Sequence, residues 1–155
     1  MKLLEELATR AWLLQYGSSA RHLFPLERRL LDELIASLSV GIGAVIRKQV
    51  QSYNLFQRDG NHQRLDFYSK TLWRTTFPES LRLSVSRSEF RLMTAAFRVR
   101  GGGPERHVVF WCVNGRLSLM SFNDSYRSIR EETDIEFLKK TVAVPPLDRQ
   151  PPERP

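Results

Sequence analysis

The stretch at residues 107–122, "HVVFWCVNGRLSLMSF", constrains the fold of this chain more than any other feature. Runs rich in β-branched and aromatic residues flank Asn114-Gly115. This dipeptide is the strongest short-range hairpin signal, because a type I′ turn needs positive φ at both central residues. We therefore predict two antiparallel strands joined by a two-residue loop, which also fixes the residues that lie opposite one another.

The predicted register divides the hairpin into two faces. The first is nearly all apolar and carries Val108, Phe110, Cys112, Leu117 and Leu119, with Ser121 at its end. The second carries His107, Val109, Trp111, Val113, Arg116, Ser118, Met120 and Phe122. The second face is too apolar for open water, so it either packs under helices or forms a pocket or a dimer interface. Its candidate interface or pocket residues are Trp111, Met120, Phe122 and His107.

Cys112 is the only cysteine of the 155-residue chain and stands five residues after His107. In a strand, five residues span roughly 17 Å at a rise of ~3.4 Å per residue, and the odd separation places the two side chains on opposite faces. His107 therefore cannot activate Cys112, and we predict that Cys112 is a buried core residue. A single cysteine forms no internal disulfide, which fits a reducing compartment.

The rest of the chain changes from helical to strand periodicity near residue 54. Apolar residues at helical spacing predict helices over residues 3–14, 25–38 and 44–53, with a break at 39–43. Alternation and turn signals predict a hairpin around Asp59-Gly60 and strands at residues 81–87 and 90–100. We also expect a short helix within residues 129–140.

Together these elements predict an α+β fold with two or three N-terminal helices packed on a curved, mostly antiparallel sheet of about six strands. The order of the elements resembles cone-shaped folds of the cystatin or nuclear-transport-factor type. We expect a single domain over residues 1–144. Residues 145–155 hold five of the eight prolines and predict a disordered tail.

Motifs for catalysis, cofactors and metals are weak. The "GIG" at residues 41–43 and the "GGGP" at residues 101–104 lack the features of phosphate-binding loops. His22, His62 and His107 fall on three different predicted elements without metal-ligand spacing. We therefore expect no catalytic residue, no cofactor and no metal site.

The charge of the chain is unevenly distributed. Residues 45–100 carry eleven basic and four acidic residues, which equals the net charge of +7 of the whole chain. Arginines near aromatic side chains on one sheet face would suit phosphate contact and base stacking. Arg82, Arg98 and Arg100 are the candidate anion or nucleic-acid contacts. The alternative is a solvated face whose arginines pair with acidic residues elsewhere.

The sequence favours a non-enzymatic, cytoplasmic domain that binds a protein partner or forms a homodimer. The alternatives are a nucleic-acid-binding module using residues 45–100, and a small-molecule or enzymatic site in a sheet cavity lined by Trp111, Met120 and Phe122. No apolar run approaches the ~20 residues of a membrane span, so we expect no membrane partner. The arrangement of the basic side chains in the fold would distinguish the first two hypotheses.

Overall fold

The computed structural model describes residues 1–14, 18–71 and 74–142. The predicted tail at residues 145–155 lies outside these residues. The helices are α1 (Lys2–Leu14), α2 (Pro25–Ser37) and α3 (Val40–Ser52), with short 3-10 helices η1 (Ser18–Arg21), η2 (Glu79–Leu81) and η3 (Arg127–Ile129). The strands are β1 (Leu55–Arg58), β2 (Arg64–Tyr68), β3 (Glu89–Val99), β4 (Arg106–Val113), β5 (Arg116–Phe122) and β6 (Ile135–Val142).

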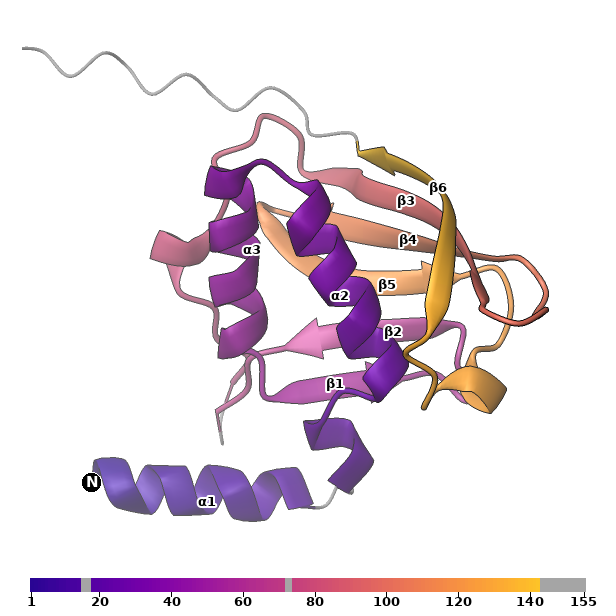
Figure 1. The fold of residues 1–155 in the computed structure, drawn as a ribbon. Helices are drawn as coiled ribbons and strands as arrows, with labels where there is room; N and C mark the ends of the chain where they lie inside the picture. The colour runs from indigo at the N-terminus through magenta and orange to yellow at the C-terminus, as the bar shows by residue number, and fades with distance from the viewer. Residues whose placement is uncertain (15–17, 72–73, 143–155) are drawn as a thin grey trace, which may run out of the picture.

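The six strands form one antiparallel sheet in the order β1-β2-β5-β4-β3-β6. Figure 1 shows α2 and α3 lying across one face of this sheet, with α1 apart from them beyond the β1 edge. The α+β class with helices on an antiparallel sheet is therefore confirmed. Within the described residues, no helix is both long and apolar enough to cross a membrane.

The helical hairpin of α2 and α3 depends on local signals at its ends and at its turn. Pro25 occupies the start of α2, where its missing N–H costs nothing, and the Glu27 carboxylate accepts the Phe24 backbone N–H. The expected break between the helices exists but is shorter than residues 39–43, because α2 ends at Ser37 and α3 begins at Val40 and includes both glycines. A Cβ on Gly43 would lie 3.0 Å from the carbonyl oxygen of Ile35, so glycine here permits close helix packing.

Two of the predicted elements are wrong. Residues 81–87 form no strand: they leave η2 and run alongside the hairpin turn, where the Leu83 N–H donates to the Gly115 carbonyl. The helix expected within residues 129–140 is replaced by η3 and β6. In β6, Ile135 pairs with Val99, and Phe137 pairs with Phe97 and contacts its ring. This pairing buries Ile135 in the core, where it is 4% exposed.

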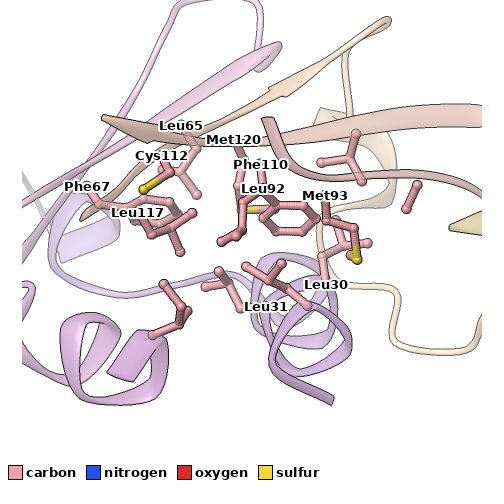
Figure 2. Close-up of a cluster of buried hydrophobic side chains, with 14 of the residues drawn as sticks. Leu30, Leu31, Leu65, Phe67, Leu92, Met93, Phe110, Cys112, Leu117 and Met120 are labelled. Carbon is pink, nitrogen blue, oxygen red and sulfur yellow. The ribbon is translucent and has the colours of Figure 1, made fainter. Parts of the chain in front are cut away.

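The core lies between the sheet and the α2–α3 hairpin. Figure 2 shows Leu30 and Leu31 of α2 facing Leu92, Phe110 and other side chains of the sheet. Cys112 belongs to this cluster and is fully buried, and burial raises the pKa of its thiol to about 12. The structure thus agrees with the prediction that Cys112 is a core residue. Its thiol stays protonated near neutral pH and lacks the reactivity of an exposed thiolate.

Candidate functional site

The turn between β4 and β5 has the predicted conformation. Asn114 and Gly115 have φ angles of 50° and 76°, both positive as a type I′ turn requires. Val113 pairs with Arg116 and Cys112 with Leu117, as expected from the two-residue loop.

Beyond these two pairs the predicted register is wrong by one residue. Cys112 lies opposite Leu117, but Trp111 lies opposite Leu119, so Ser118 is an extra residue in β5. Such a β-bulge places two residues opposite one and turns every following side chain to the other face.

The bulge moves two candidate residues into the core. Met120 pairs with Phe110, and Phe122 pairs with Val108; the two candidates are 0% and 8% exposed. Their assignment to the Trp111 face is therefore corrected. Leu119, which was predicted to share the face of Cys112, lies opposite Trp111 instead. A cavity lined by Trp111, Met120 and Phe122 does not form, because Met120 and Phe122 point away from Trp111.

The face of the sheet opposite α2 and α3 is the candidate site, and we call it the outer face. Its centre consists of the half-buried side chains Val109, Trp111, Val113, Leu119 and Ser121. Core neighbours on the same strands, by contrast, are almost fully buried. The centre of the outer face is therefore an apolar strip of the hairpin that remains partly open to solvent.

Trp111 is held in a defined orientation at the centre of the outer face. Its indole Nε1 donates to Ser121 Oγ at 3.1 Å. The Arg91 guanidinium lies over the ring, 5.3 Å from its centroid. The hydrogen bond to Ser121 and the stacked Arg91 fix the position of the ring but leave it partly accessible. Aromatic anchors of binding surfaces are held in the same way.

The fourth interface candidate, His107, lies on the same face at the start of β4. It is exposed, and its Nε2 is 3.1 Å from a carboxylate oxygen of Glu105. A shallow depression beside it is lined by residues of β3, β4 and β6, including Thr94, Leu138 and Lys139. The structure therefore keeps His107 and Trp111 on one face, separated along β4.

The three candidate anion contacts are not brought together. Arg98 and Arg100 lie at the end of β3, and Arg82 lies beside the hairpin turn, near the start of that strand. An eleven-residue strand spans roughly 35 Å. Each of the three is paired in turn, Arg82 with Glu79, Arg98 with Glu136 and Arg100 with Asp134.

A buried polar cluster at the start of α2 was not expected from the sequence. Glu27 is fully buried, and its carboxylate accepts the Arg58 Nε at 2.7 Å and the Tyr126 hydroxyl at 2.6 Å. Burial, together with the adjacent Glu27 carboxylate, raises the pKa of Tyr126. Because the Phe24 N–H also donates to Glu27, the carboxylate is saturated and ties α2 to two distant segments. This arrangement is structural.

The described residues contain no group of three or more histidine, cysteine or acidic side chains arranged to hold a metal ion. His62 lies at the edge of the Glu27 cluster, where burial and then the neighbouring Arg127 and Arg58 lower its pKa. Comparison of the chain with protein-family models, with curated proteins and with solved structures finds no match. The case for a function therefore rests on the chemistry of the outer face.

Proposed function

We propose that the protein is a non-enzymatic binding module whose outer face contacts a protein partner. The observation that carries this proposal is the oriented, half-buried Trp111 beside Val109 and Leu119, on the sheet face that α2 and α3 leave uncovered. Protein interfaces concentrate their binding energy in a few aromatic and arginine side chains surrounded by polar residues. Trp111 and Arg91 supply both kinds of side chain in one contact.

The rim of the outer face indicates the character of the partner. Arg64 and Arg98 are paired with Asp66 and Glu136 and so add little net charge. Arg91 is exposed, and no ion pair joins it to any carboxylate of the described residues. The proposed partner therefore offers an apolar surface with a carboxylate positioned over Arg91, since complementary charges favour association and specificity.

The nucleic-acid alternative has less support. A nucleic-acid interface needs several unpaired cations on one surface, because affinity comes from displaced counterions. The candidate contact Arg82 lies beside the hairpin turn near the start of β3, whereas Arg98 lies near the end of β3, and each donates to a carboxylate. A cytoplasmic location and the cone-like order of elements stay predictions within this proposal.

Site-specific photo-crosslinking tests the proposal in cells that make the protein. A photoreactive residue would replace Leu119 on the outer face or, as the control, exposed Asp32 on α2. We expect a discrete protein adduct from position 119 and none from position 32. Equal adducts from both positions would remove the outer face as the binding surface, and an adduct with nucleic acid would favour the alternative function.

The purified partner then permits a charge-reversal measurement. Arg91→Glu should weaken binding by at least ~10-fold, about 1.4 kcal/mol, because a carboxylate would face a carboxylate. Arg28→Glu, at an exposed position of α2, is the matched control and should leave the affinity unchanged. If both variants bind as tightly as the wild type, Arg91 is not part of the interface and the proposed acidic partner is wrong.

A further inference from the structure

Helix α1 carries an apolar stripe with coiled-coil spacing. Leu4, Leu7, Ala11 and Leu14 are separated by three, four and three residues, the spacing of the two apolar positions in a heptad. The three leucines are 71%, 54% and 59% exposed, and neighbouring Leu3 is 70% exposed. We call these five residues the α1 stripe.

The α1 stripe points away from the rest of the protein. Leu13, on the opposite side of the helix, is the buried residue of α1. The depression between α1 and the body is lined on the helix side by Leu13 and by polar residues that include Lys2, Glu6 and Thr9. A surface helix ordinarily turns its apolar side toward the core, whereas α1 turns its apolar side to solvent. The α1 stripe therefore has no partner within the described structure.

We propose that the α1 stripe pairs in antiparallel fashion with the same stripe of a second copy of the chain. With a two-fold axis at Thr9, Leu4 lies opposite Leu14 of the second copy. The same axis places Leu7 opposite Ala11, so a large side chain meets a small one at the two central positions. The stripe is thus complementary to itself, as an isologous dimer interface requires.

The helix dipole of α1 favours the antiparallel arrangement. The last turn contains no basic residue to offset the partial negative charge of its free carbonyls, and the first turn has the partial positive charge of its free N–H groups. An antiparallel pair places the first turn of each helix beside the last turn of the other. A parallel pair would instead bring like helix ends together.

Two other occupants fit the α1 stripe poorly. Residues 143–155 contain Val144 and Leu147 as their large apolar side chains, too few to cover the stripe. Helices that lie on membranes have a polar side rich in lysine and arginine. The polar side of α1 instead balances Lys2 and Arg10 with Glu5 and Glu6. If a helix of a different protein is the occupant instead, the purified chain should stay monomeric in the following test.

Sedimentation of the full chain from ~1 to ~200 µM tests the pairing, since a small helical interface predicts a dimer of micromolar affinity. The wild type should be dimeric in the upper part of this range. Leu7→Glu should weaken dimerisation by at least ~100-fold, because it places a carboxylate in the seam. Val40→Glu, at a 92% exposed position of α3, is the control and should remain dimeric. Circular dichroism should show both variants fully folded.

A wild type that stays monomeric throughout the range would overturn the proposal, whether or not α1 binds a different protein. A dimer that persists in Leu7→Glu would also overturn it, because another surface would then hold the two copies. The outcome is independent of the proposed function, which concerns the outer face. Loss of dimerisation in Leu7→Glu should leave the adduct from position 119 in place.

Cysteine cross-linking tests the orientation. Chains carrying Leu7→Cys and Ala11→Cys would be mixed, one with a mass tag, and oxidised; native Cys112 is buried and does not interfere. We expect disulfide-linked pairs between the two different variants and few between identical ones. Strong cross-linking of Leu7→Cys with itself would show a parallel pair and overturn the antiparallel arrangement.

Discussion

Gln49 of α3 reaches the β4–β5 turn, where its amide nitrogen donates to the carbonyl oxygen of Gly115 at 3.0 Å. The same nitrogen donates to the Leu81 carbonyl at 2.6 Å, and Gln49 Oε1 accepts the Leu117 N–H at 2.8 Å. The side chain is completely buried. One amide therefore satisfies backbone groups of the hairpin and of η2, and fixes the end of α3 against the sheet.

Gln49→Ala is expected to lower the free energy of unfolding by about 2–4 kcal/mol, because it leaves the buried Leu117 N–H and carbonyl groups unpaired. Gln51→Ala, at an exposed position of the same helix, should change it by less than ~0.5 kcal/mol. Urea unfolding of both variants measures the difference. Equal effects would show that water or a local shift replaces the Gln49 contacts.

Gly115→Ala should be among the most destabilising single-methyl changes in the chain. Gly115 has positive φ, and an added Cβ would lie 2.3 Å from the Leu83 carbonyl oxygen. Gly101→Ala separates the two effects, because Gly101 also has positive φ but an added Cβ there meets nothing within 4 Å.

We expect Gly101→Ala to lower the free energy of unfolding by about 1–2 kcal/mol through backbone strain alone. Gly115→Ala should lower it by a further ~1–3 kcal/mol, because the added Cβ also clashes with the Leu83 segment. Thermal unfolding of the two variants compares them directly. If Gly115→Ala is no worse than Gly101→Ala, the segment around Leu83 moves aside without loss of stability.

Features determined by neighbouring residues could be predicted from the sequence. The Asn114-Gly115 turn is a local signal, and the burial of Cys112 follows from it because only one pair separates Cys112 from the turn. The bulge at Ser118 has no comparable signal. It depends on how β5 packs against β2 and the helices, so the faces of Met120 and Phe122 could not be predicted.

Features that depend on distant pairing were missed for a related reason. Ile135 pairs with Val99, and Phe137 with Phe97, about forty residues earlier in the chain. The short apolar spacing near the end of the chain fits a helix or a strand, and only the partner strand decides between them. The periodicity of α1 likewise predicts a helix, but the outward direction of Leu7 depends on the position of the whole helix.

Cys112→Ser is expected to lower stability by about 1–3 kcal/mol near neutral pH, because it buries a hydroxyl in the apolar cluster. The difference in the free energy of unfolding between the wild type and Cys112→Ser should become smaller above pH 9. Burial raises the thiol pKa from about 9 to about 12, so between these values the unfolded wild type loses a proton that the folded protein keeps.

The wild type then loses up to ~1.4 kcal/mol of stability per pH unit, whereas serine does not ionise and the variant escapes this loss. Urea unfolding at pH 8 and pH 10 measures the change. A constant gap would mean that Cys112 ionises as easily in the folded protein as in the unfolded chain. Rapid labelling of the native protein by a thiol reagent would lead to the same conclusion.

Glu27 and Arg58 permit a test of a buried ion pair against an exposed one. Arg58 Nη2 and Glu27 Oε2 are 2.6 Å apart, and the two side chains are 7% and 0% exposed, respectively. In the exposed pair, the Arg98 side chain is 46% and the Glu136 side chain 39% exposed. Glu27→Gln keeps the shape of the side chain but leaves the Arg58 charge buried without its carboxylate. We expect it to lower the free energy of unfolding by about 3–5 kcal/mol.

Glu136→Gln should cost less than ~1 kcal/mol, and salt should reduce this cost further, because the exposed charges are already screened by water and ions. Urea unfolding at low and high salt compares the two variants. The double variant Glu27→Gln with Arg58→Met should recover part of the loss, since it removes the uncompensated charge along with its partner. Equal costs for Glu27→Gln and Glu136→Gln would show that the Glu27 cluster admits water and contributes no more than a surface pair.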